Sequence, residues 1–411
     1  MAHALTTSPN LLQWEAIPPG KAVSPADILP LARAAVAAAP ENAELKVQLA
    51  RTLFAADRLT ELLDWLRPMM QHDDIHPELL YQFGRAALLS GDNQAAASVL
   101  RRAADRGFRQ ALALLAEALA GLKRNDECID VAIDALKSPS EDFRPLSLLA
   151  SILPGRGETR RLWQLCLDLR ARDYWGGYLP AVTAFAAASL GYDDELELLI
   201  NPARWFAATQ IGVPPGFNQD LSAELLGNRF LAPVHSTKAT RGSGSWIERL
   251  DVRGGASVKE LFARIQTAVE SYVAERLRYA DDPMVRFRPS STRVDSWATL
   301  VHDDGYQKWH VHPAGWISGV YYVDVPDLEG AGDIEFGLLP FGNRIAEFRA
   351  PSWRVRPRPG LLLLFPSYYA HRTWPTEVND VRISIAFDVT PTGPRQPSQH
   401  SGSTGHDTSG I

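Results

Sequence analysis

Residues 41 to 210 carry a turn signal that returns at a nearly constant distance, between 32 and 35 residues. The residues that begin these signals are Ala56, Gly91, Asn125, Gly157 and Gly191. Between them the chain is rich in Ala and Leu at helical spacing, as in AELKVQLARTLFAADRLTELLDWL, with almost no β-branched alternation. A period of this length predicts helix pairs that bury a continuous core only by stacking on one another.

One copy of the repeat, residues 77 to 108, shows the pattern most completely. Small residues, Gly84 on the first predicted helix and Ala96 on the second, would let the two helices approach closely. Ala116 and Cys128 occupy the same positions in the next copy, so we interpret Cys128 as a packing thiol rather than a nucleophile. The period and the pattern resemble tetratricopeptide repeats. This resemblance implies an all-α helical solenoid.

The residue pattern of the sequence changes after Pro214 and Pro215. Residues 285 to 390 form short β-like runs separated by Pro and Gly, namely VRFRPSSTRVDSWATLV, ISGVYYVDV, GDIEFG, GLLLLFP and VRISIAFDV. Such a series predicts a β-sandwich or barrel. The helix-like segment SVKELFARIQTAVESYVAERL precedes the runs, and we expect it to pack on the outside of a sheet.

These changes predict four segments and a multidomain α + β fold. Residues 1–40 are expected to form an N-terminal segment with a capping helix, and residues 41–212 the tetratricopeptide-like repeats. Residues 213–392 are expected to form the β domain with flanking helices. Residues 393–411 are rich in Pro, Gly, Ser and Thr, which predicts a disordered tail.

Composition excludes several classes of protein. A net charge of −6 gives no electrostatic reason to expect a nucleic acid partner. The two cysteines, Cys128 and Cys166, cannot build a disulfide framework or a cysteine-based zinc site, and they fit a reducing cytoplasm. No signal-peptide pattern and no run of 18 apolar residues is present, so we expect neither secretion nor a membrane span.

Polar residues that can bind a metal and an anion recur through the β region. His310 and His312 are one residue apart, and on a strand they would share one face and could chelate one ion. An H-x-H pair alone is a weak signal. His371 follows 59 residues later, after the apolar run GLLLLFP. Eleven residues further on, Arg382 and Ser384 alternate with apolar neighbours, and a buried arginine demands an anion.

The order of these residues resembles the core pattern of the 2-oxoglutarate and Fe(II)-dependent oxygenases, and most closely that of their bacterial and phage branch. That pattern is H-x-acid, then His about fifty to sixty residues later, then Arg-x-Ser after about ten more. The resemblance covers about residues 215–390 and is strong over 302–388, through SGVYYV, the Pro-Gly run ending in FPS and His, and RISIAF. It implies a double-stranded β-helix, or jelly roll, that binds Fe(II) and uses 2-oxoglutarate and O2 as co-substrates.

The resemblance also implies roles for individual residues. His310 and His371 would be iron ligands and part of the catalytic site. Arg382 and Ser384 would bind the distal carboxylate of 2-oxoglutarate, and Tyr322 aligns with a tyrosine that assists at the same carboxylate.

His312 departs from the family pattern, which has Asp or Glu at this position to complete a facial triad of two histidines and one carboxylate. Three interpretations stay open. His312 is the third metal ligand, or Asp303 or Asp304 folds in as the ligand, or His312 lies behind the ligands and the site is weak or inactive. We favour the first, because strand geometry already presents the His312 ring to the ion.

The function implied by the resemblance is hydroxylation of a substrate with release of succinate and CO2. Helical repeats commonly bind peptide segments in a concave groove, which suggests a protein or peptide partner. Two alternatives stay open. One is a repeat scaffold whose β domain is catalytically degenerate, and the other is a cupin-type metalloenzyme. The cupin alternative is disfavoured because no Glu follows His312 until Glu329, and because Arg382 and Ser384 have no cupin counterpart.

Overall fold

The computed structural model describes residues 25–138, 142–172, 178–234, 239–277, 288–327, 330, 332–341, 351–377 and 379–392. The predicted disordered tail at residues 393–411 and the whole segment before α1, residues 1–24, lie outside these residues. The chain divides into two compact units between Leu167 and Asp168. The first unit is helical, and the second contains all of the described strands.

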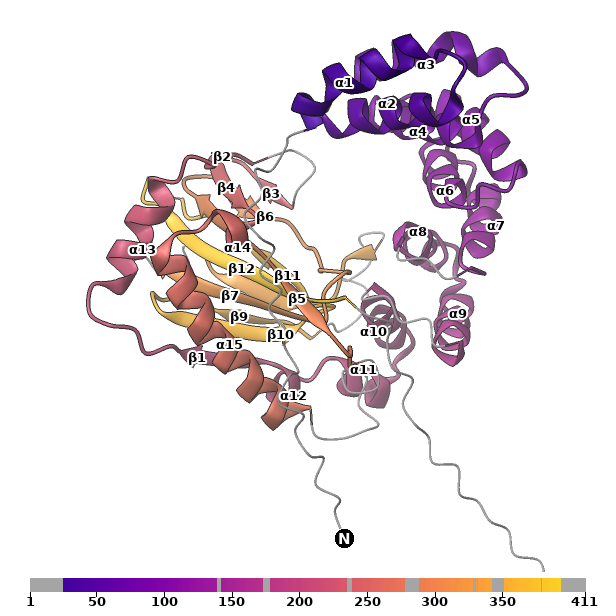
Figure 1. Cartoon of the computed structure of the whole chain (residues 1–411). Helices are drawn as coiled ribbons and strands as arrows, with labels where there is room; N and C mark the ends of the chain where they lie inside the picture. The colour runs from indigo at the N-terminus through magenta and orange to yellow at the C-terminus, as the bar shows by residue number, and fades with distance from the viewer. Residues whose placement is uncertain are drawn as a thin grey trace, which may run out of the picture. The chain divides into compact units, whose positions relative to one another are not determined.

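The first unit is a run of helices in which successive helices from α1 to α8 pack on one another. Three pairs of alternate helices, α2 with α4, α4 with α6 and α6 with α8, also make contact. These helices are α1 (Pro25–Ala38), α2 (Ala43–Ala55), α3 (Leu59–Leu66), α4 (Pro77–Leu89), α5 (Asn93–Asp105), α6 (Ala111–Gly121), α7 (Asn125–Ala135), α8 (Arg144–Ile152) and α9 (Thr159–Ala171). Two 3-10 turns, η1 (Arg67–Gln71) and η2 (Pro154–Arg156), interrupt the series. Figure 1 shows the pairs lying one after another, which confirms the predicted helical N-terminal half.

A residue in the left-handed conformation closes the first helix of each pair. These residues are Asp57, Gly91, Lys123, Gly157 and Gly191, with φ between 56° and 81°. The predicted turn period is therefore confirmed at four of its five positions. The turn expected at Asn125 is misplaced, because Asn125 already begins α7 and the chain reverses two residues earlier. Lysine gives no turn signal in a sequence, since it rarely adopts positive φ.

Close packing within the pairs also follows the prediction. A Cβ atom at Gly84 would lie 2.5 Å from Cγ of Leu100, so only glycine lets α4 and α5 approach this closely. Ala96 and Ala116 are fully buried. Cys128 is buried as well, and burial raises the pKa of its thiol to about 11. The thiol is therefore protonated and unreactive near neutral pH, as a packing residue should be.

The second unit begins with the helices α10 (Tyr178–Leu190), α11 (Asp193–Leu199) and α12 (Pro202–Trp205). The later helices are α13 (Phe217–Leu226), α14 (Leu250–Arg253) and α15 (Ala256–Arg276). The strands are β1 (Ala207–Gln210), β2 (Ala232–Pro233), β3 (Thr240–Arg241), β4 (Gly244–Glu248), β5 (Thr292–Val301), β6 (Tyr306–Gln307), β7 (Ile317–Asp324), β8 (Ile334–Gly337), β9 (Trp353–Val355), β10 (Leu361–Pro366), β11 (Ala370–Thr373) and β12 (Arg382–Pro391). Of the predicted runs, β5, β7, β8, β10 and β12 fall where the sequence places them.

The strands of the described ranges form three antiparallel sheets. The largest has the order β1-β10-β7-β12-β5-β4-β2, a smaller one has the order β11-β8-β9, and β3 pairs with β6. Neighbours far apart in the sequence therefore lie side by side, as β7 and β12 do with Ser384 opposite Tyr322. This antiparallel architecture confirms the predicted β half and is consistent with a jelly roll.

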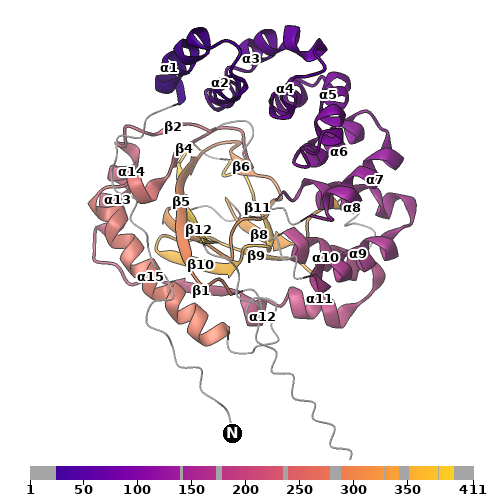
Figure 2. The same cartoon turned by 45° about the vertical axis from the view of Figure 1, so that its right-hand side comes forward.

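One face of the large sheet is covered by helices (Figure 2). Phe262 of α15 makes an edge-to-face contact with Phe387 of β12, with ring centroids 6.3 Å apart. The Tyr321 hydroxyl of β7 donates a hydrogen bond to Asn218 of α13 at 2.7 Å. The helix predicted before the strands thus packs on the outside of the sheet. Because side chains alternate along a strand, every second residue of β5, β7 and β12 faces away from these helices and into the site.

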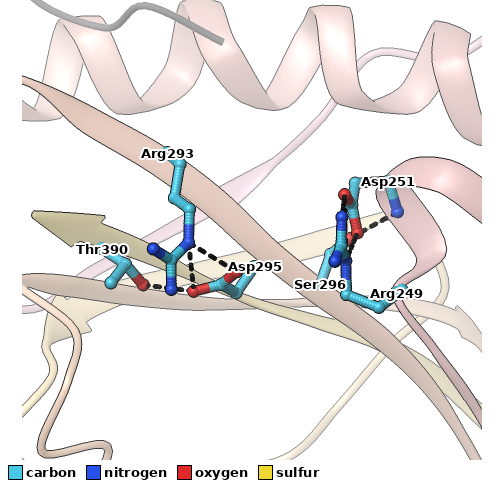
Figure 3. A network of polar contacts seen from close by, with 6 residues as sticks. All are labelled: Arg249, Asp251, Arg293, Asp295, Ser296 and Thr390. Carbon is cyan, nitrogen blue, oxygen red and sulfur yellow. Dashed lines mark hydrogen bonds and ion pairs between the residues drawn. The ribbon is translucent and has the colours of Figure 1, made fainter. Parts of the chain in front are cut away.

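A polar network fixes the end of β5 (Figure 3). Asp295 accepts hydrogen bonds from Arg293 at 3.0 Å and from Thr390 of β12 at 2.8 Å. Ser296, on the opposite face of the strand, accepts one from the backbone N–H of Asp251 in α14 at 2.9 Å. The network ties β5 to its neighbouring strand on one face and to a helix on the other.

Among the described residues, no helix is both long enough and apolar enough to cross a membrane.

Candidate metal centre and co-substrate pocket

Three histidines, two from one short segment and one from β11, converge on the wall of a pocket. His310, His312 and His371 each offer a nitrogen atom, and these atoms lie within 4.8 Å of one another. Their ring centroids are 4.3 to 5.2 Å apart. This is the one group of metal-binding side chains found within the described ranges.

Backbone pairing explains why these residues meet. His310 and His371 exchange two backbone hydrogen bonds of 3.0 Å, and the N–H of His312 donates to the Ser367 carbonyl at 2.9 Å. We expected His310 and His312 to lie on a regular strand, and this is wrong, because the segment makes only an isolated bridge. The extended backbone still directs both rings into the pocket. A tight turn follows, where a Cβ at Gly315 would lie 2.4 Å from Oγ of Ser367.

Each imidazole is held through its Nδ1 atom. The Nδ1 of His310 lies 2.8 Å from the Lys308 carbonyl, and that of His371 lies 2.9 Å from the Tyr369 carbonyl. The Nδ1 of His312 lies 2.8 Å from a carboxylate oxygen of Asp388. Carbonyl and carboxylate oxygens only accept, so each Nδ1 carries the proton and each Nε2 carries a free lone pair.

The surroundings keep His310 and His371 neutral. Burial, followed by the neighbouring His312 ring, lowers the pKa of His310 to about 3. Burial also lowers the pKa of His371 well below its ordinary value of 6.5. Aromatic rings provide the apolar shell, since Phe365 lies 5.1 Å from the ring of His371 and Trp297 stacks on His312 at 5.4 Å. Neutral imidazoles are the form that binds metal.

A buried cation, Arg382, lines the same pocket. Arg382, at the start of β12, is 1% exposed. Its guanidinium donates to the Gly332 carbonyl at 2.8 Å and to Thr373 Oγ1 at 3.3 Å, whereas its buried Nε has no hydrogen-bond partner. Within the described ranges, no Asp or Glu forms an ion pair with it. Gly332 is left-handed, with φ of 66°, and a Cβ there would lie 3.0 Å from Cδ of Arg382.

Two further predicted residues lie beside this arginine. Tyr322 of β7 and Ser384 of β12 are 2% and 7% exposed and are cross-strand neighbours. Burial raises the pKa of the Tyr322 hydroxyl to about 12, so it remains a proton donor. The pocket is lined by all six predicted site residues, His310, His312, His371, Tyr322, Arg382 and Ser384.

The structure does not bring the alternative carboxylates into the site. Asp304 accepts hydrogen bonds from the backbone and the hydroxyl of Ser243 at 2.9 and 2.7 Å. Asp303 lies 2.9 Å from the Nδ1 of His302. Neither carboxylate belongs to the histidine group.

Several pocket residues were not identified from the sequence. They are Trp297, Thr299, Gln307 and Thr373 on the pocket wall, and Asp388 behind His312. For Asp388 a signal existed, because alternation along β12 places positions 382, 384, 386 and 388 on one face. For Thr373 none existed, since its contact with Arg382 joins strands of two different sheets.

Comparison with known proteins agrees with this site. Residues 295–388 match the model of a family described as "Putative 2OG-Fe(II) oxygenase". No curated protein matches the chain.

Three solved structures are similar to parts of the chain. A prolyl-4-hydroxylase from Pseudomonas putida is 16% identical, with a TM-score of 0.34, over 47% of this chain and 96% of that one. HygX from Streptomyces hygroscopicus, solved with nickel and 2-oxoglutarate bound, is 14% identical, with a TM-score of 0.35, over 48% and 87%. YrrB, described as a TPR protein with an unusual peptide-binding site, is 13% identical, with a TM-score of 0.34, over 41% and 88%.

The family match favours the oxygenase over the cupin and scaffold alternatives, because it spans the segment that carries His310, His371 and Arg382. It confirms the enzyme class and the cofactors expected from the sequence. The chain therefore contains a 2-oxoglutarate-dependent oxygenase domain that uses Fe(II).

Proposed function

We propose that this protein is a dioxygenase that hydroxylates its substrate and releases succinate and CO2. The observation that carries the proposal is the pairing, within one pocket, of three convergent imidazole nitrogens with a buried arginine that lacks a carboxylate partner. The three imidazole nitrogens suit Fe(II), and the buried arginine suits the distal carboxylate of 2-oxoglutarate. The enzymatic unit corresponds to residues 213–392, on a double-stranded β-helix.

The residues present fit a metal ion. The buried Nε2 of His312 has no hydrogen-bond partner, which is costly for a buried polar atom unless it has a ligand. The other two histidines are neutral and fixed in the Nδ1–H form. We assign His310, His312 and His371 as the three ligands. Iron bound here, together with 2-oxoglutarate and O2, would supply the oxidising power of the reaction.

The pocket's own residues would bind and orient the co-substrate. Arg382 would pair with the distal carboxylate through its free Nε and its remaining N–H groups. Tyr322 and Ser384 would donate hydroxyl hydrogen bonds to the same carboxylate. Burial strengthens these charged hydrogen bonds, since the surroundings have a low dielectric constant.

Other side chains would exclude water from the reacting centre. Phe365 packs on His371, and Trp297 stacks on His312, so aromatic rings flank the histidines on two sides. Exclusion of water protects a reactive centre from side reactions. Trp297 is only partly buried, and it lines the pocket next to the metal ligands, where a substrate would enter.

Anaerobic titration of the metal-free protein with Fe(II) and 2-oxoglutarate tests this proposal. We expect a weak visible charge-transfer band in the wild type and its loss in the His371→Ala variant. His302→Ala is the matched control, because His302 pairs with Asp303 outside the histidine group. If the band persists in His312→Ala, His312 is not an essential ligand.

Admission of O2 to the loaded protein should then produce succinate, measured by mass spectrometry. Absence of both the charge-transfer band and tight metal binding in the wild type would overturn the proposed function.

We further propose that the helical repeats are tetratricopeptide repeats that bind a protein or peptide substrate. Arg85 of α4 lies over the ring of Phe54 at 3.7 Å and over Tyr81 at 5.6 Å, and Tyr81 contacts Phe108. Half-buried arginine and aromatic side chains are suited to peptide recognition. A peptide library incubated with the full chain should yield products heavier by one oxygen atom. Arg85→Ala should raise KM for such a peptide and leave kcat unchanged.

We place the enzyme in the cytoplasm, since the two cysteines, both buried free thiols, suit a reducing compartment.

A further inference from the structure

One of the three histidines differs from the others in the group that accepts the hydrogen bond from its Nδ1 atom. His310 and His371 donate their Nδ1 protons to neutral backbone carbonyls, whereas His312 donates to the Asp388 carboxylate. Both oxygens of Asp388 are close, at 2.8 and 3.0 Å from Nδ1. Only one of the three imidazoles therefore has a carboxylate directly behind it.

Among the site histidines, Asp388 contacts His312 alone. Its side chain is 13% exposed, and that of His312 is 11% exposed. Within the described part of the chain, no lysine or arginine pairs with this carboxylate. Its second contact is the hydroxyl of Ser318 in β7, which donates to it at 2.6 Å. Ser318 is 1% exposed and holds the carboxylate in place from the neighbouring strand.

The neighbouring carboxylate of Asp295 pairs with an arginine rather than with a histidine. Asp295 lies directly opposite Asp388 in the β5–β12 pairing, and so on the same face of the sheet. Arg293 neutralises it at 3.0 Å, and Thr390 donates to it at 2.8 Å (Figure 3). Two aspartates thus occupy equivalent places on adjacent strands, and only Asp388 contacts a histidine of the site.

Building on the proposed metal site, we propose that Asp388 is a positioning residue that acts on the metal through His312. Its carboxylate fixes the Nδ1–H form of the ring and draws that proton toward itself, which increases the electron density at Nε2. His312 and Asp388 together then replace the carboxylate ligand that a facial triad would contain. The negative charge is retained, but it lies one imidazole away from the metal.

The test compares metal binding by full-length, metal-free variants, with Co(II) as the probe and a chromophoric chelator as competitor. Asp388→Asn should weaken Co(II) binding by about 10- to 100-fold, the range typical of lost partners behind metal ligands. Asp295→Asn is the matched control, since it removes one carboxylate from the same face without touching a histidine. We expect it to change the affinity by less than about twofold. Asp388→Glu should recover part of the loss.

A spectroscopic readout separates this role from a merely structural one. In the Co(II) form, the Nδ1 protons of the three histidines should give three shifted, solvent-exchangeable proton resonances. Asp388→Asn should move or remove one resonance and leave the other two in place. If Asp388→Asn does not fold, Ser318→Ala serves instead, because it frees the carboxylate and should move the same resonance by less.

The outcomes are distinct. If wild type binds no Co(II), the proposed metal site itself fails. If wild type binds Co(II) and Asp388→Asn binds equally well with all three resonances unchanged, only the role of Asp388 is refuted. Equal losses in Asp388→Asn and Asp295→Asn would show a general effect of charge on this face of the sheet, and would also refute it.

Discussion

Arg382 offers the sharpest test of the co-substrate pocket. Its guanidinium is buried, two of its N–H groups bond to Gly332 and Thr373, and its Nε has no partner. Substitution with glutamine keeps a polar side chain that can still donate to Gly332, but removes the charge and the fork of donors. A hydrogen bond to a charged group contributes about 1.5 to 3 kcal/mol, so the loss of two such bonds should cost about 3 kcal/mol or more.

A loss of about 3 kcal/mol corresponds to a roughly hundredfold weaker affinity for 2-oxoglutarate. The assay is anaerobic titration of the Fe(II)-loaded protein with 2-oxoglutarate, followed by the charge-transfer band. The affinity for the metal alone should not change, because Arg382 makes no contact with the three histidines. Arg354→Gln is the control, since Arg354 is half exposed and pairs with Glu335 outside the pocket. An affinity for 2-oxoglutarate within about threefold of wild type in the Arg382→Gln variant would refute the assignment of Arg382 to the distal carboxylate.

Three further predictions follow from individual contacts. Tyr322→Phe should weaken 2-oxoglutarate binding by about 1.5 kcal/mol, or roughly tenfold, through loss of one hydroxyl donor to a charged group, and the same titration measures it. Gly84→Ala should lower the free energy of unfolding by about 1 to 3 kcal/mol, because the added methyl group overpacks the contact with Leu100. Gly155→Ala, with open space around it, should not lower it, and urea unfolding measures both variants. The metal-free protein should lose stability as the pH falls from 6.5 toward 3, because unfolded histidines take up protons that His310 and His371 do not. Each histidine should contribute a slope of about 1.4 kcal/mol per pH unit to the free energy of unfolding in that window. Urea unfolding near neutral pH and at pH 5 measures this change, and equal free energies at the two pH values would contradict burial of the two rings in the neutral form.

The order of the elements could be predicted because local signals decide it. Turn residues and apolar spacing fixed the helix pairs, and Pro and Gly bounded the strands β5, β7, β8, β10 and β12. The one displaced turn, at Lys123, shows where such signals fail. A residue with no preference for positive φ adopts it there because the packing of α6 on α7 requires it.

The candidate site was predictable to the extent that its residues alternate along single segments. His310 and His312 are separated by one residue, and Arg382 and Ser384 share one face of β12. The regular strand predicted for His310 and His312 was wrong, because a single bridge to His371 replaces the ladder that the alternation suggested. The surrounding sheet, rather than local propensity, determines how long a strand can continue pairing.

The sequence alone determined which residue types are present and at what spacing, and so the helical first half, the β-rich second half and a metal and anion chemistry for the latter. Tertiary structure decided which of them meet. It separated Asp303 and Asp304 from the site and placed Asp388, 76 residues beyond His312, against its ring. It also paired Arg382 with Gly332 and Thr373 while leaving its Nε without a partner. The physical reason is that hydrogen bonds between β-strands join segments distant in the chain, and no local pattern encodes which ones they join.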